Sequence, residues 1–127
     1  MSNALMKLLP AAAVAGGGAA NQEDIQKQIE QVVNYTKVTA VQYELNNIAK
    51  YIYVDVSSGS PKPDKSKFSD YLRKNQRTNL GVDRDPSLDM WETKYVLIYD
   101  KDRFYVYSAG PDKKFRTDDD LYAGYQF

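Results

Sequence analysis

Four aspartates crowd one short segment near the C-terminal end of the chain. Asp112 comes first, and the triplet at 118–120 follows after two lysines and an arginine. Carboxylates this close repel one another unless positive charge lies among them. A loop of this kind can hold a hard cation such as calcium, which takes roughly six to eight oxygen ligands. Alternatively, the neighbouring basic side chains balance the charge in water.

Two further kinds of site are disfavoured. An EF-hand is excluded, because with Asp112 as the first ligand the alternate ligand positions fall on Lys114 and Arg116, and the invariant glycine is missing. Acid–base catalysis by two aspartates needs a pocket that raises one pKa, and nothing in the sequence shows such a pocket. We therefore expect a non-enzymatic protein, while a calcium loop and a charge-balanced polar turn both stay open.

The chain of 127 residues contains no histidine and no cysteine. This excludes thiol nucleophiles, Ser-His catalysis, Cys/His zinc sites and disulfides. Any bound metal would then be a hard cation with oxygen ligands. Because 17 basic and 17 acidic side chains balance, no basic field exists to attract nucleic acid, and we expect no nucleic-acid partner.

The composition divides the chain into an apolar, glycine-rich segment over residues 1–20 and a single domain over 21–127. The apolar run of the first segment, from Leu8 to Ala20, is too short to span a bilayer, which needs about 20 apolar residues. A secretory signal ending at Ala20 is one interpretation. Ser2-Asn3-Ala4 is typical of a cloning remnant, which would place the native start further upstream.

One long helix is expected from about residue 22 to 53. Asn21 and Asp24 form a capping pair, and apolar residues then recur in steps of three and four. We interpret this stripe as the core face of an amphipathic helix. Its members are Ile25, Ile29, Val32, Val33, Val38, Val41, Leu45, Ile48 and Ile52.

A loop and a shorter helix follow. Residues 57–67 are rich in Ser, Gly, Pro and Lys, so the long helix must end before them. Phe68, Tyr71 and Leu72 stand at helical spacing after Ser66, which we predict to cap a short second helix.

The C-terminal part predicts an antiparallel sheet. Residues 94–100 and 103–109 are rich in aromatic and β-branched residues and form a hairpin joined by Asp100-Lys101-Asp102. Residues 121–127 add a third strand. The predicted fold class is α+β, with the long N-terminal amphipathic helix packed on a small C-terminal antiparallel sheet.

Residues 87–121 resemble the end of the major pseudopilin of type II secretion systems, in the type IV pilin-like superfamily. The family pattern is an Asp-Pro-Trp-Gly-x-Pro-Tyr turn, a hairpin, then Ser-x-Gly-x-Asp-Gly and an acidic pair. Residues 7–13 and 41–47 are similar to two stretches of the pilin-like first helix. The matching residues are Asp89, Trp91, Thr93 and Tyr95 in the turn, and Ser108, Gly110, Pro111, Asp112 and 118–121 in the loop.

The resemblance implies a pilin-like fold and a calcium ion bound in this loop. Where the family has glycines, the chain has Lys113 and Arg116, which would be strained if those positions need a positive φ. The implied ligands are the side chains of Asp112, Asp119 and Asp120, with main-chain oxygens near Ala109, Lys114 and Thr117.

The resemblance also implies a structural subunit of a pseudopilus or pilus-like filament of a bacterial secretion system. Its partners would be copies of itself and other pseudopilins, contacted through the long helix. It would belong to the inner membrane and periplasm, with membrane contact only through an N-terminal segment that is missing from this sequence. Which secretion or pilus system it serves, and whether as major or minor subunit, does not follow from the residues.

An alternative is a soluble pilin-like adaptor module of the periplasm. The chain has eleven tyrosines, and tyrosine is enriched at protein interfaces. A simpler interpretation is that tyrosines such as Tyr95, Tyr99, Tyr105 and Tyr107 line the two faces of the hairpin.

Overall fold

The computed structural model describes residues 22–76 and 84–127 of the chain. The chain divides into two compact units, residues 1–39 and 40–127. The glycine-rich segment 1–20 and the Asn21 cap lie outside the described residues. No helix within the two described ranges is both long and apolar enough to cross a membrane.

The long helix α2 runs over Gln22–Ser57, so it ends one turn beyond the predicted residue 53. Its end is a glycine C-cap: Gly59 has a φ of 109°, and the N–H groups of Gly59 and Ser60 donate to the carbonyls of Val56 and Asp55. Such a cap satisfies carbonyl groups that the last helical turn leaves without partners.

The apolar stripe of α2 has two different environments. Within the unit 40–127, Val41, Leu45, Ile48 and Ile52 are at most 3% exposed, which confirms the prediction of a core face. Within residues 22–39 the prediction is wrong for four of the five stripe residues, which are solvent-exposed, while Val38 is half-buried. Periodicity shows that residues share one helix face, but it does not show that anything covers that face. The exposed members are Ile25, Ile29, Val32 and Val33.

The second helical segment begins differently from the prediction. A 3-10 turn, η1 (Lys65–Lys67), leads into helix α3 (Phe68–Asn75), and Ser66 lies inside the turn rather than at a cap. Asp64 caps the 3-10 turn, because its carboxylate accepts a hydrogen bond from the Ser66 N–H at 2.9 Å, whereas α3 itself has no side-chain cap. The buried side chains of Phe68 and Leu72 then anchor α3 in the core.

The predicted hairpin and third strand are confirmed. Strands β1 (Val96–Asp100), β2 (Arg103–Ser108) and β3 (Leu121–Gln126) form an antiparallel sheet in the order β1-β2-β3. The turn is one residue shorter than expected, since Asp100 pairs with Arg103 across the two residues Lys101 and Asp102.

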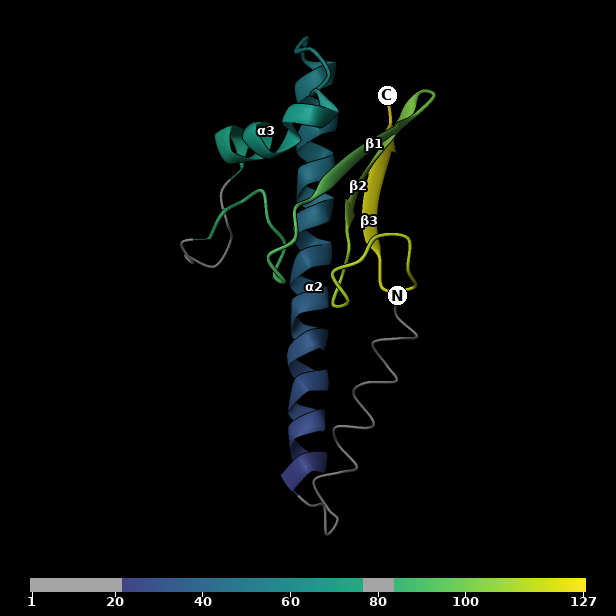
Figure 1. Ribbon diagram of the computed structural model, residues 1–127. Helices are drawn as coiled ribbons and strands as arrows, with labels where there is room; N and C mark the ends of the chain where they lie inside the picture. The colour runs from purple at the N-terminus through teal and green to yellow at the C-terminus, as the bar shows by residue number, and fades with distance from the viewer. Residues whose placement is uncertain (1–21, 77–83) are drawn as a thin grey trace. The chain divides into compact units, whose positions relative to one another are not determined.

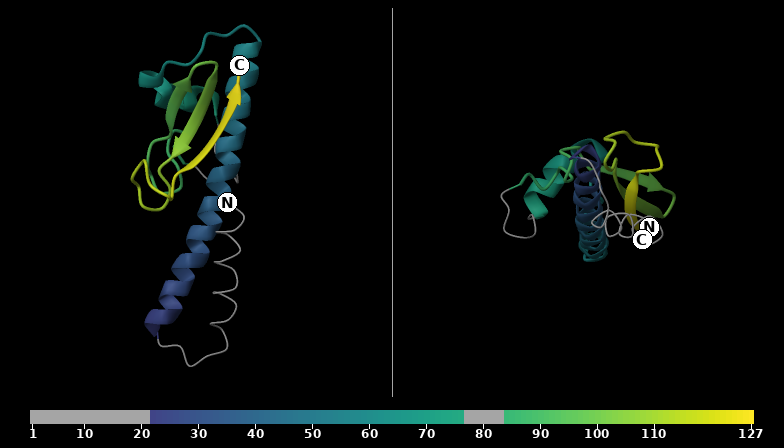
Figure 2. Two further views of the ribbon diagram at one scale, coloured as in Figure 1. Left: turned by 90° about the vertical axis from the view of Figure 1, so that its right-hand side faces the viewer. Right: turned by 90° about the horizontal axis from the view of Figure 1, so that it is seen from below.

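The sheet packs against the C-terminal part of α2, which confirms the predicted α+β arrangement (Figures 1 and 2). At the β3 edge, the Gln42 side chain donates a hydrogen bond to the Tyr122 carbonyl at 3.0 Å, and Tyr53 stacks on Tyr125. Fully burying an apolar side chain such as leucine, valine or phenylalanine contributes about 1.5–3 kcal/mol. The sheet's main core residues are Leu97, Phe104, Val106 and Leu121.

Candidate functional site

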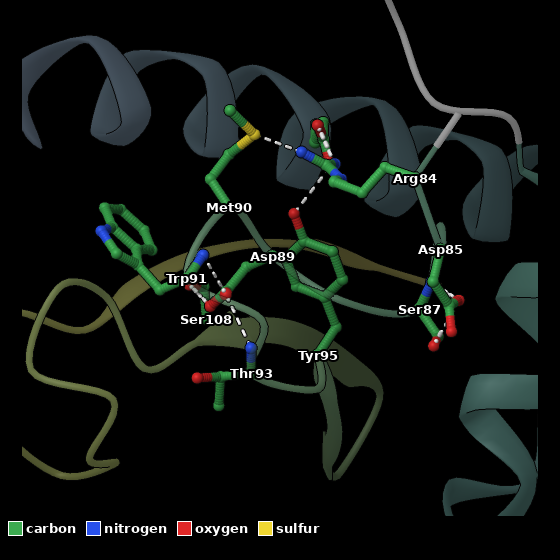
Figure 3. Close-up of polar contacts among 10 residues, drawn as sticks. Arg84, Asp85, Ser87, Asp89, Met90, Trp91, Thr93, Tyr95 and Ser108 are labelled. Atoms are coloured by element: carbon green, nitrogen blue, oxygen red, sulfur yellow. Dashed lines mark hydrogen bonds and ion pairs between the residues drawn. The ribbon is translucent and has the colours of Figure 1, made fainter. Parts of the chain in front are cut away.

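Asp89 organises the turn that precedes the sheet. Its carboxylate is fully buried and accepts hydrogen bonds from the N–H groups of Trp91 and Thr93, at 2.9 and 3.0 Å. Its second oxygen accepts the Ser108 hydroxyl at 2.7 Å (Figure 3). Three donors compensate the carboxylate for its lost hydration, so one side chain fixes the turn and ties it to the end of β2.

The same contact reaches the start of the acidic loop. The Ser108 hydroxyl oxygen accepts the N–H of Gly110 at 3.2 Å. Gly110 has a φ of 77°, and a Cβ at this position would lie 2.2 Å from the carbonyl oxygen of Asp119. Only glycine fits such an approach, so the two ends of the loop meet at this point.

A second polar cluster joins α2 to the residues before β1. Arg84 forms an ion pair with Glu44, and the Tyr95 hydroxyl donates to the same carboxylate at 2.8 Å (Figure 3). Burial raises the pKa of Tyr95, and the adjacent charge of Glu44 raises that pKa further. The ion pair is only partly exposed, at 21% for the Arg84 side chain and 15% for that of Glu44.

The acidic loop, residues 109–120, folds on its own hydrogen bonds. Asp112 accepts the N–H of Lys114 at 2.9 Å, and Asp120 accepts the N–H of Arg116 at 2.7 Å. The Thr117 hydroxyl donates to the Lys114 carbonyl at 3.1 Å. Hydrogen bonding from the Thr117 side chain, and then from the Lys114 backbone, lowers the pKa of Asp112. These contacts favour the ionised form of the loop's first aspartate.

The two positions where the pseudopilin pattern has glycine do take left-handed backbone conformations. Lys113 has a φ of 59° and Arg116 a φ of 65°. A residue with a Cβ is disfavoured in this region by about 1–2 kcal/mol. The loop therefore has the backbone conformation that glycine would favour at these two positions, and Lys113 and Arg116 are strained in it.

The predicted ligands occupy different environments. Hydrogen bonds connect Lys114, Thr117 and Asp120, whereas Ala109 is buried and the Asp119 side chain is exposed. Across residues 22–76 and 84–127, no three acidic side chains form a group that could hold a metal ion. The carboxylates of Asp112 and Asp120 thus accept backbone N–H groups of their own loop, and calcium at this loop stays a prediction.

The Glu44, Arg84 and Tyr95 cluster was not predicted. Its members are 40 and 51 residues apart in sequence, and no short motif joins them. One signal was available: Glu44 follows Val41 by three residues and precedes Ile48 by four, which places a carboxylate beside the buried stripe. A charged residue at core spacing predicts a buried partner.

Comparisons with family models, with curated proteins and with solved structures found no match to this chain.

Proposed function

We propose that this protein is a structural subunit of a pilus-like filament of a bacterial secretion system, which packs against copies of itself and other pseudopilins through residues 22–39 of α2. The observation that carries the proposal is the exposed apolar stripe of this segment. Ile25, Ile29, Val32 and Val33 are between 43% and 56% exposed.

The spacing of these four residues suits helix-to-helix packing. They stand at positions i, i+4, i+7 and i+8, which lie on one helix face. Apolar side chains on such a face gain free energy when a second helix removes them from water. A copy of the same segment offers a matching stripe, as repeated packing in a filament requires.

The turn and loop lend separate support. Asp89, Trp91, Thr93 and Ser108 carry the resemblance to pseudopilins, and they belong to two segments separated by the hairpin. In the structure they form one hydrogen-bonded cluster around the Asp89 carboxylate. Because these residues match the family pattern and also contact one another, they favour a C-terminal structure shared with pseudopilins. The proposal places this part of the protein in the periplasm, beside the inner membrane.

Single-cysteine cross-linking tests the assembly surface, because the chain has no cysteine of its own. Ile29→Cys should form disulfide-linked dimers on mild oxidation, much faster than Lys50→Cys, an exposed position of α2 outside the stripe. Thiol pairing requires the two Cα atoms to come within about 7 Å. Equal rates for the two variants would reject the stripe as the contact.

A charge substitution gives an independent readout. Ile29→Glu should lower the sedimentation coefficient of the concentrated protein while leaving its melting temperature almost unchanged, because the side chain is 56% exposed. Val54→Glu, at an apolar position of α2 that is 51% exposed but outside residues 22–39, is the matched control. The proposal fails if both substitutions alter self-association alike.

The proposal includes calcium binding at the 109–120 loop. An ion that binds only the folded loop adds about 2.7 kcal/mol of stability at a hundred times its dissociation constant. Asp119→Ala should therefore lower the melting temperature in calcium but hardly in chelator, while Asp118→Ala, outside the implied ligand set, should behave alike in both. If the melting temperature of the unsubstituted chain is the same in calcium and in chelator, the loop does not bind calcium.

The periplasmic adaptor remains the second candidate, supported by the aromatic face of the sheet. Tyr107 stacks on Tyr122 with ring centroids 5.3 Å apart, and Tyr105 contacts both rings. Tyr122 is 55% exposed, and Val96 and Ile98 are exposed on β1. Self-association that falls with Tyr122→Ala but not with Ile29→Glu would favour the sheet face over the helix stripe.

A further inference from the structure

The two edges of the sheet differ in how much of their backbone is covered. The order β1-β2-β3 leaves β1 and β3 as the edge strands (Figure 1). At the β1 edge, Leu97 is only 2% exposed, and the Tyr99 hydroxyl donates to the Pro63 carbonyl at 2.6 Å. At the β3 edge, Gly124 is exposed. Because glycine has no side chain, this exposed surface belongs to the main chain.

The hydrogen-bonding pattern of the sheet shows which backbone groups of β3 point outward. The Phe127 N–H donates to the Asp102 carbonyl at 2.8 Å, so these two residues form a hydrogen-bonded pair. Hydrogen-bonded and non-hydrogen-bonded pairs alternate along an antiparallel ladder. In the register of β2 with β3, the N–H and carbonyl groups of Gly124 and Gln126 therefore point away from β2.

One outward group of β3 already has a partner. The Gln42 side chain donates to the Tyr122 carbonyl at 3.0 Å, which agrees with the alternation. In the part of the chain that the structure describes, no hydrogen bond from outside the sheet reaches the backbone of Gly124 or Gln126. Each chain therefore offers two N–H and two carbonyl groups to an added strand.

The sequence of β3 lacks the features that keep edge strands apart. Proteins protect an exposed edge with charged side chains, with proline or with a bulge. The strand Leu121–Gln126 has no charged residue and no proline, and its pairing with β2 runs without interruption. The 17 basic and 17 acidic side chains also balance, so two copies carry no net repulsion. An uncharged strand of this kind is suited to pair with a copy of itself.

We propose that two copies of this protein pair through their β3 edges, as antiparallel strands related by a two-fold axis at Tyr125. Gly124 of each copy then lies opposite Gln126 of the other, and the two pairs exchange four backbone hydrogen bonds. The bond between Gln42 and Tyr122 stays in place, because Tyr122 lies three residues from the axis, outside these pairs.

The surrounding contacts favour this axis over its neighbour. An axis at Gly124 would put Tyr122 into a hydrogen-bonded pair and displace Gln42. With the axis at Tyr125, the two copies of this residue face each other across a non-hydrogen-bonded pair. Tyr125 is 40% exposed and stacks on Tyr53 with ring centroids 5.3 Å apart. Pairing of two copies therefore extends an aromatic stack as well as the sheet.

This contact differs from the filament contact proposed above. An isologous two-fold contact closes after two copies, whereas a filament needs a heterologous contact that repeats. The β3 edge also lies outside residues 22–39. The inference therefore stands or falls separately from the packing of α2 in a filament.

Cysteine cross-linking tests the position of the axis. Across a non-hydrogen-bonded pair the Cα atoms lie about 4.5 Å apart, which suits a disulfide. The control Tyr122→Cys is at a more exposed position, at 55% against 40%, but its two copies lie about 20 Å apart in the paired strands. On mild oxidation, Tyr125→Cys should form linked dimers about tenfold faster than Tyr122→Cys. Equal rates would overturn the inference.

Removal of one backbone donor tests strand pairing without changing the aromatic contact. Gln126→Pro loses an outward N–H, so its ladder with β2 should remain. Gln126→Ala is the matched control, because it also loses the side-chain bond to Asp102 but keeps the N–H. In sedimentation equilibrium, Gln126→Pro should raise the dimer dissociation constant about tenfold, and Gln126→Ala should change it less than about twofold. Equal changes in the two variants would exclude strand pairing.

Hydrogen exchange of the full chain labelled with nitrogen-15 reports on the paired groups directly. On dilution, the Gly124 and Gln126 amides should exchange faster with solvent, whereas the Ala123 and Tyr125 amides, bonded to β2, should not. The same dependence should persist in Ile29→Glu, which removes the stripe contact of α2. Exchange at Gly124 and Gln126 that does not depend on concentration would overturn the inference. The β2 and β3 amide signals show whether each variant keeps its sheet.

Discussion

Aspartate side chains hold two loops of the unit 40–127 by similar local hydrogen bonds but in opposite environments. Asp89 accepts two backbone N–H groups of its turn and is fully buried. Asp112 and Asp120 also accept backbone N–H groups, within a loop whose residues 113–119 are exposed. Water can replace the donors in the second loop but not in the first.

The difference in burial determines how much the hydrogen bonds of each carboxylate contribute to the stability of the fold. A buried carboxylate cannot lose its partners without a desolvation penalty, whereas an exposed one exchanges them for water at little net cost. The Asp89 turn is therefore expected to contribute more to the stability of the unit 40–127 than the acidic loop does. The hydrogen bonds of the 109–120 loop should therefore contribute less to stability.

Removing the buried carboxylate should have the largest effect. Asp89→Ala leaves the N–H groups of Trp91 and Thr93 and the Ser108 hydroxyl without their acceptor. We expect a loss of about 3 kcal/mol in the free energy of unfolding. Urea denaturation measures it, with Asp112→Ala as the matched control, for which the loss should stay below about 1 kcal/mol. Similar losses for the two would break the comparison.

The second largest effect is expected in the cluster beside the turn. Glu44→Gln keeps the size of the side chain but removes the charge that faces Arg84, so about 2 kcal/mol should be lost. Asp70→Asn is the control, because its ion pair with Arg73 is exposed, and the change should stay within about 0.5 kcal/mol. Equal stability curves for both variants would show that partial burial contributes nothing to the Glu44 pair.

Alkaline pH should affect the buried region next. An unfolded tyrosine releases its proton near pH 10, whereas Tyr95 keeps it because its pKa is raised in the fold. The unfolded state then binds fewer protons, so stability is full below pH 10 and falls above it, by about 1.4 kcal/mol per pH unit for this one group. Tyr95→Phe should reduce that slope, and an unchanged slope would contradict the assignment.

The smallest effect is expected in the exposed loop. Asp120→Ala removes the acceptor for the N–H groups of Arg116 and Thr117, which water can then bind. Without calcium, we expect a loss of about 0.5–1 kcal/mol, measured by thermal denaturation in chelator. A loss as large as that of Asp89→Ala would show that burial does not distinguish the contributions of the two loops to stability.

The elements of the fold were largely predictable because local patterns determine them. Aromatic and β-branched runs marked all three strands, and the spacing of Val41, Leu45, Ile48 and Ile52 marked the buried half of the stripe. Burial of Ile25 and Ile29 could not be judged, since exposure depends on what the fold brings nearby. The Ser66 cap was misplaced because helical structure begins two residues earlier: Asp64 caps the 3-10 turn, and its carboxylate accepts both the N–H and the hydroxyl of Ser66.

The candidate site was less predictable. The crowding of Asp112 and 118–120 was visible, but the hydrogen bonds that each carboxylate makes depend on the turns between them. Pairing of Asp89 with Ser108 joins residues across the whole hairpin, and pairing of Glu44 with Arg84 joins a helix to a distant segment. Only the tertiary arrangement creates such contacts.

The unequal connections of the sheet have a kinetic consequence. Lys101 has a φ of 57°, as the first position of a II′ hairpin turn requires, so β1 and β2 are joined by the shortest practical link. β2 and β3 are joined by the whole 109–120 segment, whose closure costs more entropy. We therefore expect β1–β2 pairing to nucleate the sheet and β3 to dock after the rate-limiting step. Any ligand that holds the segment closed should then prolong the lifetime of the native state while leaving the refolding rate unchanged.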